Sequence, residues 1–165
     1  MPSGTRLASL APWEYVVLRA TSARILDAAG PGLDADAVVR RADADLATVD
    51  DPGVRAGVQE VLTLVEYGPV LRGYLRPFSA LPAASQDHLL AGLERSRFTL
   101  GRAAFSIVKL FACYYHYTDP AAWPALGYDG PWVGRVPMPA YSVDYGTRNG
   151  AAFSSGTRPY PSGKA

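Results

Sequence analysis

The sequence SRFTLGRAAFSIVKLFACYYHYTDPAAWPALGYDGP, residues 96–131, decides the fold of this chain. From Phe98 to Tyr117 almost every residue is apolar, aromatic or small, which predicts one long helix. A helix that is apolar nearly all round is typically buried inside a bundle. The residues after Asp119 contain Pro, Gly and aromatic side chains in a pattern that cannot continue the helix. The stretch therefore predicts a central, buried helix that leads into a rigid aromatic loop.

Cationic side chains interrupt the long helix at regular intervals. Arg102, Lys109 and His116 are seven residues apart, and Arg95 lies one heptad earlier. Seven residues are close to two helical turns, so these four positions are predicted to form one narrow stripe. The stripe is either a solvated seam with ion pairs to a neighbouring helix or a contact surface for an acidic partner.

Four further helices are predicted from periodic apolar residues and N-terminal caps. They span about residues 12–29, 34–48, 52–76 and 83–96, and Gly68-Pro69 is expected to kink or break the third. Asp34 and Asp51 occupy positions where a carboxylate caps the first turn of a helix. No segment alternates apolar and polar residues as a strand does. The predicted fold class is all-α, an irregular bundle of about five helices.

The last part of the chain has a different composition. Residues 132–165 hold five glycines, four prolines and three tyrosines without periodicity, together with four basic residues and one acid. This composition favours an extended C-terminal arm, which is either disordered or laid on a partner or on the chain's own bundle. The predicted organisation is a flexible start at 1–11, a helical domain at 12–131 and the extended arm at 132–165.

The overall composition excludes several classes of protein. Of the 165 residues 48% are hydrophobic and 19% charged, which is typical of a globular chain, and the net charge of +1 offers no field for nucleic acid. No apolar run approaches the length of a membrane span. The first fifteen residues show neither a secretory leader nor a twin arginine before an apolar stretch. We therefore expect a cytoplasmic protein with no membrane span.

Catalytic and metal-binding patterns are weak. Cys113 and His116 are three residues apart and would share a helical face, which permits a metal site or a thiolate–imidazole pair. Only His88 and a carboxylate would be left to complete a metal site. Paired acids such as Asp43 and Asp45 stand in positions typical of caps or solvated surfaces. No phosphate-binding glycine motif occurs. We expect neither catalysis nor a cofactor or metal in this chain, and Cys113 to be a core residue.

The aromatic loop allows two interpretations. Trp123, Tyr128 and Trp132 stand on a frame of Gly and Pro residues, with Gly127 and Pro131 at its turns. Such a cluster is well suited to anchor an interface. The same side chains would alternatively close the core of the bundle.

Several of these residues carry a resemblance to a known family. The run Phe78-Ser79-x-Leu81, then Arg102-x-x-Phe105-x-x-x-Lys109, Tyr114-Tyr115, Trp123 and Leu126-Gly127-Tyr128-x-Gly130-Pro131 resembles the gluconate 2-dehydrogenase subunit 3 family. The likeness covers roughly residues 12–132, and its specific part is 78–131. Family members are small subunits that accompany flavin-dependent oxidoreductases of the glucose–methanol–choline class. Many relatives carry a twin-arginine leader, from which this sequence departs.

The resemblance implies that the chain is an accessory subunit. It would support the folding or stability of a large subunit that holds FAD and oxidises an alcohol, a sugar or a glycoside, in a hetero-oligomer. The family pattern and the aromatic spacing together give the predicted partner interface, which comprises Arg102, Lys109, Trp123, Gly127, Tyr128, Pro131, Trp132, Tyr141 and Tyr145. The alternative is a free-standing helical protein that binds a small molecule between the central helix and the aromatic loop.

Overall fold

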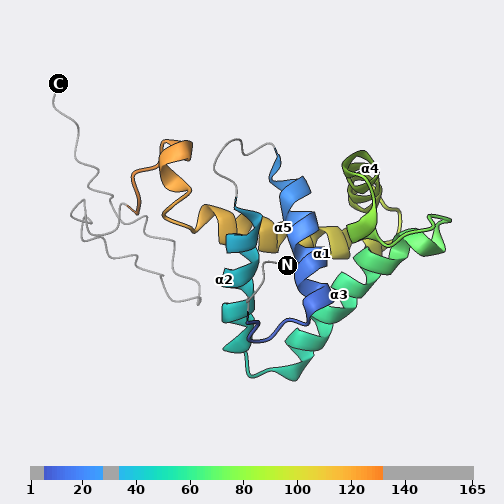
Figure 1. Ribbon diagram of the computed structural model, residues 1–165, viewed down its shortest axis with the longest axis horizontal. Coiled ribbons are helices and arrows are strands. Elements are labelled where there is room, and N and C mark those ends of the chain that lie inside the picture. The colour runs from blue at the N-terminus through green and yellow to red at the C-terminus, as the bar shows by residue number, and fades with distance from the viewer. Residues whose placement is uncertain (1–5, 28–33, 132–165) are drawn as a thin grey trace, which may run out of the picture. The chain divides into compact units, whose positions relative to one another are not determined.

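A computed structural model describes residues 6–27 and 34–131 (Figure 1). In these ranges the chain forms α1 (Pro12–Ile25), α2 (Ala35–Ala47), α3 (Pro52–Leu71), α4 (Ala83–Glu94) and α5 (Thr99–Tyr117), with short 3-10 helices η2 (Phe78–Ala80) and η3 (Trp123–Leu126). The described residues contain no strand. The predicted all-α bundle of five helices is thus confirmed, while the predicted arm at 132–165 lies outside the described residues.

Local signals set most helix boundaries. The side chain of Asp34 accepts a hydrogen bond from the backbone N–H of Ala37 at 2.9 Å, and that of Asp51 accepts one from Gly53 at 2.7 Å. Both predicted N-caps are therefore present. Pro69 lies inside the last turn of α3, which ends at Leu71 rather than at residue 76.

The long helix α5 is the centre of the bundle. It packs against each of the other four helices, and Figure 1 shows it crossing behind α1 and α2. Its buried positions are mainly small or aromatic: Gly101, Ala104, Val108, Ala112, Tyr115 and His116. The expectation that α5 is buried on all sides is wrong. Leu110 is 62% exposed and Tyr114 is 53% exposed, because the other helices cover one side of α5 and leave the opposite side uncovered.

A hydrogen bond between side chains joins α1 to α2 at the edge of the core. The hydroxyl of Tyr15, whose side chain is fully buried, donates to Asp36 Oδ1 at 2.5 Å. Arg19 binds the same carboxylate at 3.0 Å. Burial, together with the hydrogen bond to Asp36, raises the pKa of Tyr15 to about 12. The phenol therefore remains a proton donor throughout the physiological range.

A second carboxylate binds the segment that precedes α1. Asp43 of α2 is only 5% exposed and accepts backbone N–H groups from Ala8 at 2.7 Å, Ser9 at 2.9 Å and Leu10 at 2.7 Å. Asp43 is thus not a cap or a solvated surface acid, as its sequence context had indicated. Three donors converge on one carboxylate because Leu10 enters the core and carries the backbone beside it against α2.

A third carboxylate fixes the turn before α4. Glu66, buried in α3, accepts hydrogen bonds from the backbone N–H of Ser79 at 3.0 Å and from its hydroxyl at 2.6 Å. On the other side of the turn, Gln86 of α4 donates to the carbonyl of Phe78 at 3.0 Å. These contacts hold the Phe78 ring in the core, where it is fully buried.

The hydrogen bonds to Asp43 should make the stability of the fold depend on pH. Burial by itself would raise the pKa of Asp43, but the N–H groups of Leu10, Ala8 and Ser9 outweigh it and hold the pKa below its ordinary value. A carboxyl group with a lowered folded-state pKa contributes stability above its unfolded pKa and loses that contribution as the pH falls through the folded value. Asp43→Asn should therefore lower the free energy of unfolding by about 3 kcal/mol at neutral pH.

Urea unfolding of the two proteins at neutral and acidic pH measures this effect. The difference in the free energy of unfolding between the wild type and Asp43→Asn should shrink as the pH falls below the ordinary pKa range of aspartate. The exposed Asp50 offers a matched control, and Asp50→Asn should change the free energy of unfolding by less than about 0.5 kcal/mol. A difference in the free energy of unfolding between the two proteins that stays constant with pH would contradict this explanation.

Candidate partner interface

The uncovered side of α5 carries a continuous row of exposed residues. Ala103, Ser106, Leu110, Tyr114 and Tyr117 follow one another at intervals of three or four residues and are all exposed. We call this row the outer face of α5. Large apolar and aromatic side chains gathered on one surface typically mark an interaction site.

Only part of the predicted cationic stripe lies beside the outer face. Arg102 and Lys109 are both exposed along one edge of it. Arg95, in contrast, is the C-terminal cap of α4 and does not belong to α5. His116 is buried. The stripe of four is therefore wrong, because the chain breaks between the two helices and because a seven-residue spacing drifts by about 20° per heptad around a straight helix.

The two cations that remain on the edge are held by α5 and by the residues directly before it. Arg102 donates to the carbonyl of Ser96 at 2.7 Å and to Thr99 Oγ1 at 3.4 Å. The ammonium group of Lys109 lies 5.6 Å from the centre of the Phe105 ring, a cation–π distance. Helix α5 itself contains no acidic residue. This edge therefore presents fixed positive charge next to an apolar surface.

Arg41 of α2 fixes the C-terminal end of α5. Its guanidinium donates to the carbonyl of Tyr115 at 2.6 Å and to the carbonyl of Thr118 at 3.4 Å, and it lies 3.8 Å from Asp119. A cation at this position satisfies carbonyl groups that the end of a helix leaves unpaired. Arg41 lies within the helix predicted for residues 34–48, and nothing local in the sequence indicates its partner.

The aromatic loop packs on itself. Trp123 donates its indole N–H to the carbonyl of Tyr117 at 3.1 Å, and its ring meets Tyr128 edge-on with the ring centres 5.2 Å apart. Gly127 turns the chain between them with φ of +65°, a conformation that favours glycine. Trp123 is half-buried, Tyr128 is exposed, and η3 has no buried residue. These rings do not form part of the core, which favours the interface interpretation of the loop.

The remaining predicted interface residues fall in a second unit of the chain or outside the described residues. Pro131 is exposed and belongs to a second unit of the chain that begins at Gly130. Trp132, Tyr141 and Tyr145 lie outside the described residues. The structure therefore brings together Trp123, Gly127 and Tyr128 with the end of α5, and it places Arg102 and Lys109 on the edge of the outer face.

The residues considered for catalysis or metal binding do not form a cluster. His116 is buried with its ring 5.0 Å from that of Tyr117, and Cys113 is half-buried against the core. His88 is exposed on α4. In the described part of the chain no three His, Cys, Asp or Glu side chains are grouped to hold a metal ion.

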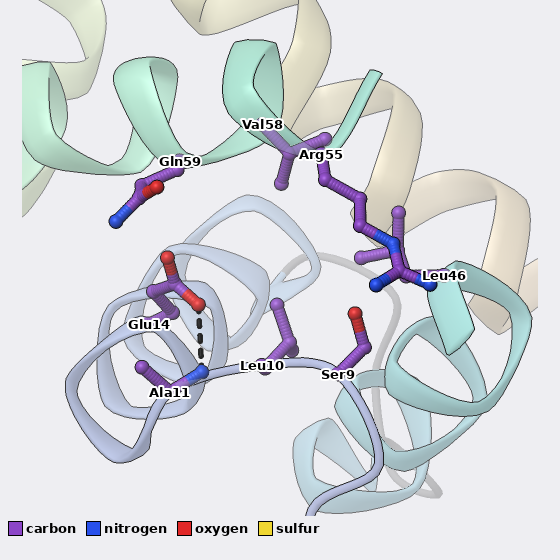
Figure 2. A pocket seen from close by; sticks show the side chains of 8 residues that line it. All are labelled: Ser9, Leu10, Ala11, Glu14, Leu46, Arg55, Val58 and Gln59. Atoms are coloured by element: carbon purple, nitrogen blue, oxygen red, sulfur yellow. Dashed lines mark hydrogen bonds between the residues drawn. The ribbon is translucent and has the colours of Figure 1, made fainter. Parts of the chain in front are cut away.

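Two of the pockets in the described part of the chain are candidate ligand sites. The first, of about 370 Å³, lies between the start of α1 and α3 and has Glu14 and Arg55 on different walls (Figure 2). Glu14 Oε2 accepts the backbone N–H of Ala11 at 2.7 Å, so this acid also caps α1. The second, of about 320 Å³, lies on α5, where Leu110 and Tyr114 are among its described lining residues. The sequence analysis missed the first pocket because its walls come from distant segments.

No family model, curated protein or solved structure matches the chain. The resemblance given above therefore rests on its motif residues. Among the described residues, no helix combines the length and the apolar content that crossing a membrane requires.

Removing the contact at the end of α5 should loosen that end specifically. Arg41→Met keeps much of the side-chain volume but leaves the Tyr115 and Thr118 carbonyls without this donor, and it should lower the free energy of unfolding by about 1 kcal/mol. Amide hydrogen exchange should accelerate between Tyr115 and Trp123, as measured by mass spectrometry on the intact chain.

The neighbouring arginine provides the control. Arg40 pairs with the exposed Asp34 at 3.4 Å, so Arg40→Met should cost less than about 0.5 kcal/mol and leave exchange near Tyr115 unchanged. Equal effects of the two substitutions would show that Arg41 does not fix the end of α5.

Proposed function

We propose that this chain is a non-catalytic small subunit of a flavin-dependent oxidoreductase. Its large partner, of the glucose–methanol–choline class, holds FAD and oxidises an alcohol, a sugar or a glycoside. The small subunit supports the folding or stability of that partner, and the two form a hetero-oligomer. The chain itself needs no cofactor for this role.

The outer face of α5 is the observation that carries the proposal. On the central helix of the bundle, Leu110 exposes most of its side chain and Tyr114 exposes about half. Burying such side chains against a partner removes apolar surface from water, at about 25 cal/mol per Å². The surface also lies within the stretch on which the resemblance rests, because Arg102, Lys109 and Tyr114 all belong to α5.

The geometry of the end of α5 supports the same role. Trp123 and Tyr128 meet edge to face on either side of the turn at Gly127, so little side-chain freedom is lost when a partner covers them. Rigid aromatic side chains are typical anchors of protein interfaces. The positive edge formed by Arg102 and Lys109 suits a partner surface that carries carboxylates.

Co-expression with a flavoprotein of the glucose–methanol–choline class, taken from the genes next to the one for this chain if one is found there, tests the proposal. The complex should purify as one species with a flavin absorbance spectrum, and the large subunit expressed alone should be less soluble or less active. Tyr114→Glu should weaken the complex at least about 30-fold, since losing an interface anchor costs 2 kcal/mol or more.

Val54 provides the matched control for this substitution. It is an exposed apolar residue on α3, so Val54→Glu makes the same kind of change away from α5 and should leave the complex intact. Circular dichroism of both variants checks that the bundle still folds. Equal yield and activity of the large subunit without this chain would refute the proposed function.

A second candidate function is the free-standing binding of a small molecule. The pocket in Figure 2 favours it, because Glu14 and Arg55 offer opposite charges on different walls and apolar residues such as Leu46 also line it. This pocket is not the one expected between the central helix and the aromatic loop. Native mass spectrometry of the chain expressed without a partner distinguishes the two functions, since a bound molecule of defined mass would support binding.

A further inference from the structure

The exposed side of α3 forms an open trough of about 490 Å³. Along α3 the trough is lined by Ala56, Gln59, Glu60, Thr63, Leu64, Tyr67, Gly68 and Leu71. We call this surface the α3 trough. It shares no residue with the outer face of α5. The opposite side of α3 carries the residues that pack into the bundle, among them Val61, Leu62 and Val65.

The side chains at the two ends of the α3 trough differ in size. The N-terminal end begins at Ala56, whose side chain is a single methyl group. The C-terminal end carries Tyr67 and Leu71, which are 52% and 87% exposed, and Leu75 beyond it is fully exposed. Contact of large apolar side chains with water is unfavourable for an isolated chain. Here such side chains follow one another at the same end of α3 and are not scattered singly.

The Tyr67 ring is already fixed in place. Its centre lies 6.5 Å from that of Trp13 on α1, with the two ring planes tilted by 47°. An aromatic side chain that is fixed before binding loses little freedom in a complex, which makes Tyr67 a suitable anchor.

The spacing of the trough residues is symmetric about its middle. The midpoint between Thr63 and Leu64 divides the eight lining residues into equidistant pairs, in which position 56 corresponds to 71, 59 to 68 and 60 to 67. An antiparallel second copy, with its twofold axis beside Thr63 and Leu64, would place Leu71 over Ala56 and Tyr67 over Glu60. The large side chains at the C-terminal end of each α3 would then pack over the small side chain at the N-terminal end of the other. The Tyr67 hydroxyl would also face a carboxylate that accepts its hydrogen bond.

Charge at the two ends of α3 favours the same arrangement. Asp50 and Asp51 precede the helix and Arg76 follows it, and all three are exposed. Antiparallel packing brings the acidic end of one copy beside the basic end of the other, and it also opposes the two helix dipoles. A parallel pair would instead place acid beside acid and base beside base.

One pair of like charges is turned away from the trough. Arg55 and Arg72 occupy symmetric positions, but Arg55 Nη2 reaches back to the carbonyl of Ala47 at 3.4 Å. Arg72 Nη1 lies against α4, 3.7 Å from where a Cβ on Gly92 would stand. Both guanidinium groups therefore leave the contact surface.

We propose that the α3 trough is a homodimer interface in which a second copy of this chain packs its own α3 in antiparallel orientation. One helix pair buries less than the roughly 1,200 Å² of a standard interface, so the dimer is weak and depends on concentration. The inference goes beyond the proposed function, since it concerns the chain alone and leaves the outer face of α5 free.

Disulfide cross-linking of the full chain tests this geometry. In a Cys113→Ala background, Thr63→Cys should form an interchain disulfide with its own copy, because Thr63 lies beside the axis. Ala56→Cys and Leu71→Cys should not link when each is alone, since each lies about 22 Å from its own copy along the helices. A mixture of these two variants should link at least ten times more.

The outcomes distinguish the alternatives. Linking of Ala56→Cys with itself would indicate a parallel pair and overturn the proposal. Equal linking at all positions would indicate random collision and also overturn it. Sedimentation velocity of the unmodified chain should show a monomer at roughly 5 µM and a dimer at roughly 500 µM, the range in which weak interfaces assemble. A monomer throughout that range would refute the interface.

Substitutions on the exposed surface provide an independent check. Leu71→Gln should raise the dissociation constant at least tenfold without changing the melting temperature of the monomer. Leu100→Gln changes a similarly exposed leucine on α5 and should leave the dimer unaffected. Asp50→Lys and Arg76→Glu should each weaken the dimer, and the two changes combined in one chain should restore it. Failure of this restoration would contradict the antiparallel arrangement.

Discussion

The packing of four helices against one side of α5 determines the rest of this structure. Small residues at Gly101, Ala104 and Ala112 let neighbouring elements approach closely on that side. At Gly101 a Cβ would lie 2.8 Å from Cβ of Ser96, so no larger residue fits without a shift. Because the four other described helices lie on one side of α5, they leave the apolar residues on its other side uncovered. The outer face is thus a consequence of how the core is built.

Polar side chains in and beside this core mainly hold the backbone around it. Asp43 binds the segment before α1, Glu66 binds the turn before α4, and Arg41 binds the end of α5. Among buried side-chain nitrogen and oxygen atoms of the described residues, Ser22 Oγ alone lacks a hydrogen-bond partner. The polar groups of the interior therefore serve the fold, and the exposed faces are the surfaces that offer binding.

The features of the fold that depend on local sequence pattern could be predicted. Helix number, the central position of α5 and the caps at Asp34 and Asp51 follow from periodicity and from side chains that reach their own first turn. The roles of Asp43 and Arg41 could not be predicted, because their partners are 33 to 77 residues away in the chain. The predicted stripe from Arg95 to His116 was wrong for a geometric reason. Heptad spacing has no meaning across the break between α4 and α5, and within α5 positions seven residues apart rotate gradually around the helix. The exposure of Leu110 and Tyr114 depends on where the other helices pack, which apolar content does not reveal.

Oxidative footprinting of the complex tests the central claim most directly, namely that a partner covers the outer face of α5. Hydroxyl-radical labelling of Tyr114 and Tyr117 would be compared between the free chain and the chain in complex with the proposed flavoprotein partner. The account predicts strong protection of both tyrosines in the complex, while the exposed Val54 reacts as in the free chain. Unchanged labelling of Tyr114 and Tyr117 in the complex would contradict it.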